Sequence, residues 1–302
     1  MKLTSWIPAN KKARLGVMIL TFFVLISLLG PLMVGDPMAF VAEPHQPPSA
    51  DHWLGTTGQG QDVLAQAIIG TRTSFLVGVG VGACVLFIAI LVGMLSGYFG
   101  GRVDTALSLL TNVLLVIPGL PLAIVIAAYL PASTWSVALV LVATGWPWGA
   151  RVLRAQTMTY REEDFVKAAR VAGERPLRIL LWEILPNMGS LLTSLFIGAT
   201  LYAIGAQVGL EFLGLGNVGE VSWGSILYWA TNDAALLTQS WWIFVPTGVC
   251  IALVGGGLTL VNYGIDEWAN PRLRSRRPWK RALKRAGVPH DGLDTPVLES
   301  RP

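Results

Sequence analysis

The chain has 302 residues, of which 53% are hydrophobic and only 13% are charged, and its mean hydropathy is +0.57. Soluble globular domains carry about 25% charged residues, so this composition excludes an ordinary soluble enzyme, a disordered protein and a secreted disulfide scaffold. The two cysteines, Cys84 and Cys250, stand in apolar runs without a second metal ligand nearby, and we expect both to be buried hydrophobic residues. The default class is therefore a membrane protein with several spans.

Several apolar segments are long enough to cross a bilayer, since a transmembrane helix needs about 20 mostly apolar residues. These candidate spans are Leu15–Val34, Phe75–Gly97, Ala106–Ala128, Trp135–Leu153, Gly189–Leu210 and Ile243–Tyr263, and Arg151 is the one charged residue among them. No small-residue cleavage site closes the first segment, so we expect a retained helix and not a signal peptide. The alternation typical of barrel strands is absent. The expected fold is an all-α polytopic membrane protein with six transmembrane helices.

Basic residues predict the orientation, because Lys and Arg gather in short cytoplasmic loops. With the N-terminus inside, 21 of the 22 basic residues fall on the inner side and only Arg72 falls outside. Acidic residues occupy the outer loops instead: Asp36, Glu43, Asp51, Asp62, Glu211, Glu220 and Asp233. Both termini are therefore expected in the cytoplasm. The basic tail then anchors the chain at the inner lipid surface, and nucleic-acid binding is a distant second explanation.

The chain divides into three parts. Residues 1–74 hold the N-terminus, the first span and an outer arm, residues 75–266 form a five-helix core, and residues 267–302 form the basic tail. The outer segment Gly35–Ser74 is rich in proline and predicts an extended arm followed by a short helix near Asp62–Ile69.

The inner loop at 161–187 has the strongest local signals. Asp164 is a plausible N-cap, and Gly173 fits the position after a helix where positive φ is cheap only for glycine. Pro176 suits the first turn of a second helix, and Pro186 is expected to end that helix before the fifth span. The pattern predicts helix, sharp turn and helix outside the membrane, although a plain amphipathic surface loop fits about equally well.

Glycine patterns elsewhere have structural explanations. Gly214–Gly219 matches the dinucleotide fingerprint G-x-G-x-x-G, but it follows a span and not a strand, so we expect a tight outer loop. With Trp223 and other tryptophans nearby, this loop looks like an interfacial or gate-lining segment. The glycines at 78, 80, 82, 93 and 97 favour close helix packing over solute contact.

Polar residues show no catalytic pattern. Asp104 and Asp266 stand at inner ends of spans beside Arg102 and Glu267, where solvation or a local ion pair explains them. The histidines are scattered, and no metal-ligand spacing or nucleophile–base pair is evident.

Several motifs in order resemble binding-protein-dependent importer permeases driven by ATP, and within them the second subunit of dipeptide and oligopeptide systems. They are Lys167-Ala168-Ala169 with Gly173 and Glu183–Pro186, His52–Thr56 with Gly60–Leu64, Gly97–Asp104, Phe212–Gly216 with Trp223-Gly224, and Asn270–Leu273. The chain departs from the usual pattern at Lys167, which replaces an acid, at Gln61, which replaces an arginine, and at the loose closing stretch Asn262–Asp266.

The resemblance implies a type I importer fold in a bacterial or archaeal inner membrane. It implies that the inner loop is a coupling helix, with a cytoplasmic ATPase contacted by Asp164, Ala168, Ala169, Arg170, Gly173 and Glu174. It assigns a gate or outer loop to Phe212, Gly214, Gly216 and Trp223. The implied partners are a second permease, two ATPases that bind ATP and Mg, an extracytoplasmic solute-binding protein and lipid.

The chain itself is expected to be non-catalytic and to bind no cofactor, because it contains no G-x4-G-K-[ST] phosphate loop. The implied solute is a di- or oligopeptide, with oligosaccharides or nickel complexes as alternatives. An ion-coupled secondary transporter is a weaker reading, since the candidate spans lack the midplane ionisable residues that such carriers use. A membrane-embedded enzyme is weaker still.

Overall fold

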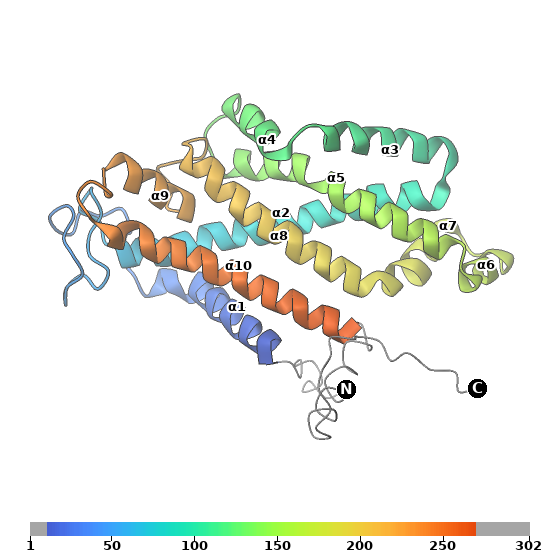
Figure 1. The fold of residues 1–302 in the computed structure, drawn as a ribbon, viewed down its shortest axis with the longest axis horizontal. Coiled ribbons are helices and arrows are strands. Elements are labelled where there is room, and N and C mark those ends of the chain that lie inside the picture. Colours follow the sequence, from blue (N-terminus) through green and yellow to red (C-terminus); the bar gives the residue numbers. More distant parts are fainter. Residues whose placement is uncertain (1–10, 270–302) are drawn as a thin grey trace, which may run out of the picture.

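The computed structural model describes the backbone of residues 11–269 and the side chains of residues 11–265. Most of the predicted basic tail at 267–302 lies outside the described residues. Within them, the chain forms helices and turns, with one isolated β-bridge between Thr56 and Asp62 and no strand. The long helices run side by side, with α6 at one end of the bundle and α9 at the other (Figure 1). The predicted all-α fold is confirmed.

Five helices form the continuous bundle: α1 (Lys11–Leu29), α2 (Val63–Phe99), α5 (Thr134–Arg161), α8 (Gly189–Phe212) and α10 (Trp241–Ala269). The shorter helices are α3 (Gly101–Val116), α4 (Gly119–Ala128), α6 (Asp164–Val171), α7 (Pro176–Arg178) and α9 (Trp223–Asn232). By length and composition the described residues hold 5 candidate spans, or 6 when the bent pair α3–α4 is one span. Each predicted span therefore has a counterpart.

The third span is broken, which the sequence prediction of a continuous Ala106–Ala128 helix missed. α3 and α4 are bent by 85° where they meet. Pro118 causes the break, because a proline ring pushes the preceding residue out of the helical region. Ile117 accordingly has extended backbone, with φ −83 and ψ 127.

The second span is longer than predicted. Its 37 residues make a helix of about 55 Å, against a bilayer core of about 30 Å. The expected separate helix near Asp62–Ile69 is instead the outer end of α2. Asp62 caps it, since its carboxylate accepts a hydrogen bond from the Ala65 amide at 2.8 Å, and Gly100 ends it at a φ of 65.

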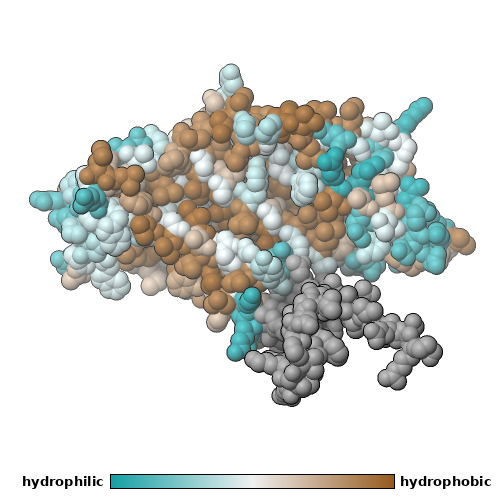
Figure 2. Space-filling view, in the orientation of Figure 1, coloured by the Kyte–Doolittle hydropathy of each residue, from teal (hydrophilic) through white to brown (hydrophobic). Residues whose placement is uncertain are grey.

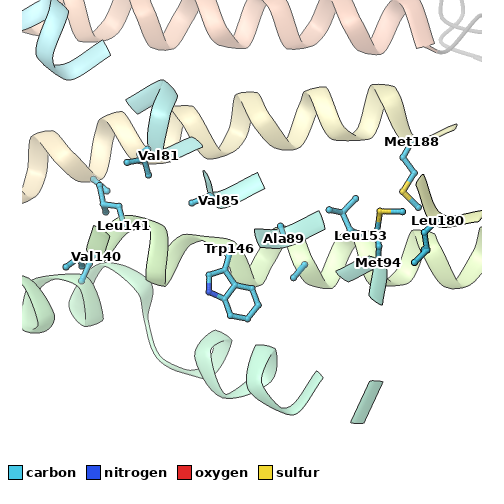
Figure 3. Close-up of a cluster of buried hydrophobic side chains, with 14 of the residues drawn as sticks. Val81, Val85, Ala89, Met94, Val140, Leu141, Trp146, Leu153, Leu180 and Met188 are labelled. Atoms are coloured by element: carbon cyan, nitrogen blue, oxygen red, sulfur yellow. The ribbon is translucent and has the colours of Figure 1, made fainter. Parts of the chain in front are cut away.

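α2 is the central helix, and it packs against α5 and α8. Buried apolar side chains from these three helices form the main core, including Val85, Leu141, Leu153 and the nearby Met188 (Figure 3). The predicted role of the glycines in close packing is confirmed at Gly93, where an added Cβ would lie 2.6 Å from the Ala150 carbonyl oxygen of α5. This contact brings the two helix backbones together.

The two flanks of the bundle differ. α1 pairs with α10 on one side, while α3 and α4 lie on the opposite side (Figure 1). The middle of the molecule presents a hydrophobic band between hydrophilic ends, as expected for a membrane protein (Figure 2). Cys84 is exposed and Cys250 is half-buried, so the expectation of burial is wrong for Cys84, whose face of α2 no described helix covers.

The segment between α1 and α2 is compact and not simply extended. Gly55 and Gly60 turn the chain at a φ of 72 in both cases, and the Thr56 hydroxyl donates to the Glu43 carbonyl at 2.7 Å. The segment also contacts the first turn of α10, where Trp242 donates to the Thr56 carbonyl at 3.3 Å. The outer end of the bundle is therefore built from two chain segments distant in sequence.

Candidate functional site

The inner loop forms the predicted helix, turn and helix. α6 ends at Val171, and two residues later Gly173, with a φ of 80, allows two backbone hydrogen bonds to close the helix. The Gly173 amide donates to the Arg170 carbonyl at 3.0 Å, and the Glu174 amide donates to the Ala169 carbonyl at 3.1 Å. This pair of bonds is a Schellman motif, which stops a helix sharply. α7 follows at once, with Pro176 in its first turn.

Two details of this loop differ from the prediction. Asp164 is the first residue of α6, Glu163 occupies the cap position, and neither makes a capping hydrogen bond. Pro186 does not end the second helix, because a π-helix at Ile179–Ile184 and a 3-10 turn at Leu185–Met188 carry it into α8. The wide π turn relieves the clash that a proline ring makes in a regular helix. α7 and α8 therefore join into one candidate span of 37 residues.

The loop is fastened to the bundle by aromatic and apolar contacts. Val166 is fully buried in the main core, and the Arg170 guanidinium lies 5.2 Å from the centroid of the Tyr98 ring at the inner end of α2. The Tyr160 hydroxyl of α5 donates to the Asn187 carbonyl at 3.0 Å. α6 is thus tied to α2, α5 and the segment that leads into α8.

The predicted coupling residues lie together on this loop. Asp164, Ala168, Arg170 and Gly173 are exposed, and Ala169 is half-buried. Glu174 pairs with Arg178 at 3.2 Å, and Lys167 lies 3.7 Å from Asp164. Sequence reasoning missed the apolar residues beside them, since Val171 and Leu177 are 89% and 60% exposed. The loop therefore presents small and apolar side chains beyond the end of the bundle.

The predicted outer-loop residues lie at the opposite end, between α8 and α9. Gly214 turns the chain with a φ of 78, and Phe212 is exposed, whereas Gly216 is buried. Trp223 is fully buried, its ring packs edge-on against Phe23, and its amide donates to the Ser74 hydroxyl at 3.0 Å. Trp223 thus anchors α9 to the bundle rather than lying at an exposed interface.

A buried carboxylate, Glu211, holds this outer turn; the sequence analysis had counted it among the outer-loop acids, whereas it lies within α8. Glu211 is 2% exposed and accepts hydrogen bonds from the Ser222 hydroxyl and from the Gln207 amide. Gly224 has no side chain that could fill this space, since an added Cβ would lie 2.4 Å from the Glu211 Cβ. Glu211 thereby links the end of α8 to the start of α9.

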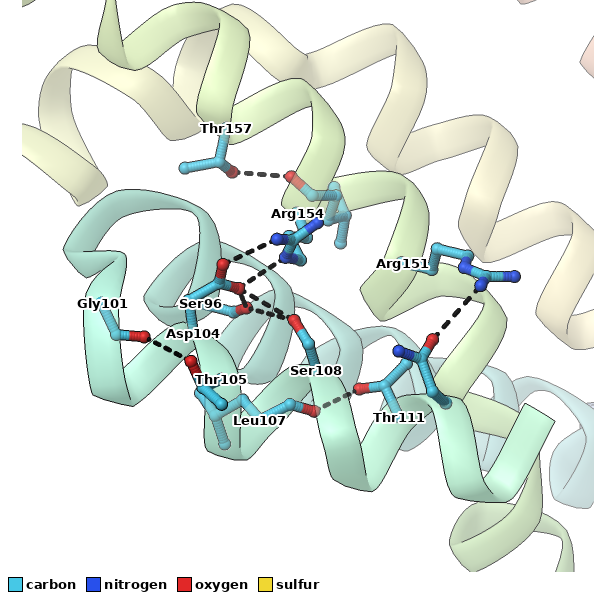
Figure 4. Close-up of polar contacts among 12 residues, drawn as sticks. Ser96, Gly101, Asp104, Thr105, Leu107, Ser108, Thr111, Arg151, Arg154 and Thr157 are labelled. Carbon is cyan, nitrogen blue, oxygen red and sulfur yellow. Dashed lines mark hydrogen bonds and ion pairs between the residues drawn. The ribbon is translucent and has the colours of Figure 1, made fainter. Parts of the chain in front are cut away.

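A polar cluster lies near the inner end of the bundle (Figure 4). Asp104 of α3 receives two hydrogen bonds of 2.6 Å from the Arg154 guanidinium of α5, and also bonds from the hydroxyls of Ser96 and Ser108. The sequence analysis explained Asp104 by solvation or by a local ion pair beside Arg102, whereas its ion-pair partner is Arg154, which is distant in sequence. Arg154, 50 residues away on another helix, is the partner because its planar guanidinium matches both carboxylate oxygens.

Two hollows follow the seam between α2, α3 and α5. The larger, of about 530 Å³, lies at the α3–α4 break and is lined mostly by apolar side chains, with Pro118, Trp148 and Tyr202 among them. The smaller, of about 190 Å³, is lined by Ser96, Ser108 and Arg154 of the polar cluster and also by Asn112 and Arg151. Among the described residues, no group of three His, Cys, Asp or Glu side chains could hold a metal ion.

Comparison with known proteins decides the family. Residues 89–275 match the family described as binding-protein-dependent transport system inner membrane component. The chain belongs to this family. The matched residues include α6, α7, the polar cluster, the smaller hollow and most of the lining of the larger one, so the permease carries most of its candidate sites within the shared part of the fold.

Several curated relatives resemble the permease over most of its length. It is 30% identical over 271 residues to the oligopeptide transport system permease protein OppC of Bacillus subtilis, covering 88% of this chain and 87% of the relative. It is 32% identical to the dipeptide transport system permease protein DppC of Alkalihalophilus pseudofirmus, covering 88% of each chain. An OppC of Mycobacterium bovis is 36% identical over 77% of this chain and 80% of its own length.

Proposed function

We propose that this permease forms half of the translocation path of an ATP-driven importer of di- and oligopeptides. A second, homologous permease completes the path, two cytoplasmic ATPase subunits bind ATP and Mg and dock on α6 and α7, and a solute-binding protein docks at the α9 end. The permease itself carries out no covalent chemistry. Its task is to convert movement of the ATPases into opening and closing of the path.

The observation that carries this proposal is the rigid, outward-facing turn at Gly173. A docking element needs exposed small and apolar residues together with firm attachment to the helices that it moves. α6 has both, because Ala168 and Val171 are exposed while Val166 is fully buried. Displacement of α6 acts directly on α5 and on the continuous α7–α8 helix.

Peptide as the solute is supported by the relatives, whose names specify oligopeptide or dipeptide transport. The mostly apolar hollow of about 530 Å³ suits solutes whose side chains vary, because apolar contact discriminates weakly between side chains. No observation favours oligosaccharides, nickel complexes or ion-coupled transport.

Site-specific crosslinking in the assembled complex tests the docking. We expect a cysteine at Ala169, on α6, to crosslink to an ATPase subunit, and a cysteine at Gln239, beyond α9, to give no such product. About 30 Å of bilayer core separates the two ends. Peptide uptake must also depend on ATP. Crosslinking from Gln239 and not from Ala169, or uptake driven by a proton gradient without ATP, would refute the proposal.

A further inference from the structure

Two arginines one turn apart on α5 have different partners. Arg154 is neutralised by Asp104, through two hydrogen bonds to both carboxylate oxygens. Arg151 donates only to the amide oxygen of Asn112, at 3.2 Å (Figure 4). Among the residues that the structure describes, no carboxylate lies within ion-pair distance of Arg151. One guanidinium charge is therefore left without an anion.

Arg151 lies near the inner end of the fourth span. It is about 26 Å along α5 from Thr134, at 1.5 Å a residue, which is close to the inner boundary of a bilayer core of about 30 Å that begins at Thr134. Charged side chains in membrane spans face the bundle interior, a water-filled cavity or the interface rather than acyl chains. In contrast, the opposite flank carries no Asp, Glu, Lys, Arg or His between Leu15 and Leu32 or between Trp241 and Ile265, as suits a surface in contact with lipid.

The space beside Arg151 has a mixed lining with many polar residues. The hollow of about 190 Å³ is lined by Ser96, Ser108, Thr111, Asn112, Arg151 and Arg154, together with Val92, Gly93 and Ala150. α3, which forms one wall, is largely exposed, with Thr111 its one buried residue. The hollow therefore lies on a face that the described chain leaves uncovered.

The apolar hollow continues the same seam toward the outer side. Its lining includes Leu114 and Leu115 on α3 and Trp148 and Gly149 on α5. These residues lie within one helical turn of Asn112 and Arg151, which line the smaller, polar hollow. An apolar space of about 530 Å³ is thus followed, toward the cytoplasm, by a cationic one.

An apolar hollow followed by one that contains arginines matches the chemistry of a peptide, which has variable side chains and one terminal carboxylate. We propose that Arg151, oriented by Asn112, binds the C-terminal carboxylate of the solute in the inner half of the path, while the hollow at Pro118 and Tyr202 receives its apolar side chains. The inference rests on the proposed peptide import and adds a binding site to it. Guanidinium groups bind carboxylates in a planar, two-bond geometry, which the amide oxygen of Asn112 does not provide.

The test uses the complete complex in vesicles, with a radiolabelled alanine tripeptide and its C-terminal amide as probes. Each rate is compared with that of the wild-type complex on the same peptide, at a concentration that saturates the solute-binding protein. Loss of one charge-assisted contact corresponds to about a ten-fold effect or more, so we expect Arg151→Gln to reduce uptake of the free acid by that factor. Uptake of the amide should stay within about two-fold.

Two further variants separate this role from a structural one. Asn112→Asp places a carboxylate beside Arg151 and should reduce uptake of the acid as Arg151→Gln does, while Arg151→Lys should recover part of it. The matched control is Arg102→Gln, an exposed arginine at the inner start of α3 outside the lining of the hollow. This control should transport both peptides at the wild-type rate.

Other outcomes overturn the inference. If Arg151→Gln reduces uptake of acid and amide alike, Arg151 pairs with an acidic residue of another subunit or supports folding. If neither rate changes, the guanidinium is satisfied by lipid phosphate or water. A wild-type complex that moves neither peptide in the presence of ATP refutes the proposed function itself, and the carboxylate site falls with it.

Discussion

The ion pair between Asp104 and Arg154 should be the main energetic tie between α3 and the rest of the permease. α3 buries little apolar surface, with Thr111 its one buried residue, so few other contacts hold it. The two side chains are 20% and 34% exposed. Their coupling energy therefore falls between the ~0–1 kcal/mol of surface pairs and the ~3–5 kcal/mol lost when a fully buried pair is broken. We expect a coupling energy of about 2 kcal/mol, because both side chains are only partly buried.

A double-mutant cycle measures this coupling. The free energy of unfolding is obtained for wild type, Asp104→Ala, Arg154→Ala and the double variant, by titration with SDS in mixed micelles and tryptophan fluorescence. Each single variant strands the partner charge, so the double variant should be less destabilised than the sum of the two. Arg161 and Glu162, 3.6 Å apart at the exposed end of α5, form the control pair, with an expected coupling of about 0.5 kcal/mol or less. Equal couplings for the two pairs would show that the polar cluster does not hold α3.

Three further substitutions test single positions. Gly173→Val should abolish ATP-driven uptake while the chain still inserts, because valine is strained at a φ of 80. The control Gly189→Val, in a helix and with open space around it, should retain uptake. Equal uptake in both variants would contradict the docking role. Gly93→Leu should lower the SDS midpoint, since its Cβ meets the backbone of α5 at 2.6 Å, and Gly80→Ala, with no atom within 4 Å, should leave it unchanged or raise it. Glu211→Ala should destabilise the chain by about 2–3 kcal/mol, because it leaves two buried donors unpaired and creates a cavity, and Glu211→Gln should lose less stability. Limited proteolysis at the α8–α9 turn measures the difference. Equal resistance of Glu211→Ala and wild type to the protease would refute the linking role.

Much of the fold follows from local properties of the sequence. Apolar length predicts the spans because a bilayer demands about 20 apolar residues from each helix, and the distribution of Lys and Arg predicts which ends face inward. The turn at Gly173 was also predictable from local sequence, because a positive φ depends on one residue and its neighbours. These features need no knowledge of what lies across the bundle.

What depends on partners distant in sequence was decided only by the tertiary structure. Asp104 was explained by solvation or a local ion pair beside Arg102 and instead bonds Arg154, because the approach of α2 and α5 at Gly93 brings that guanidinium within reach of α3. Pro186 was expected to end a helix, yet the π turn before it lets the helix continue.

The same limit applies to the candidate solute path. Arg151 was visible in the sequence as the one charge in a predicted span, but its lack of an anionic partner was not. Neither hollow could be seen either, because each is lined by helices that come together only in the folded chain. Helix formation depends on neighbours along the chain, whereas charge pairing and cavities depend on which helices meet, and only the packed bundle determines that.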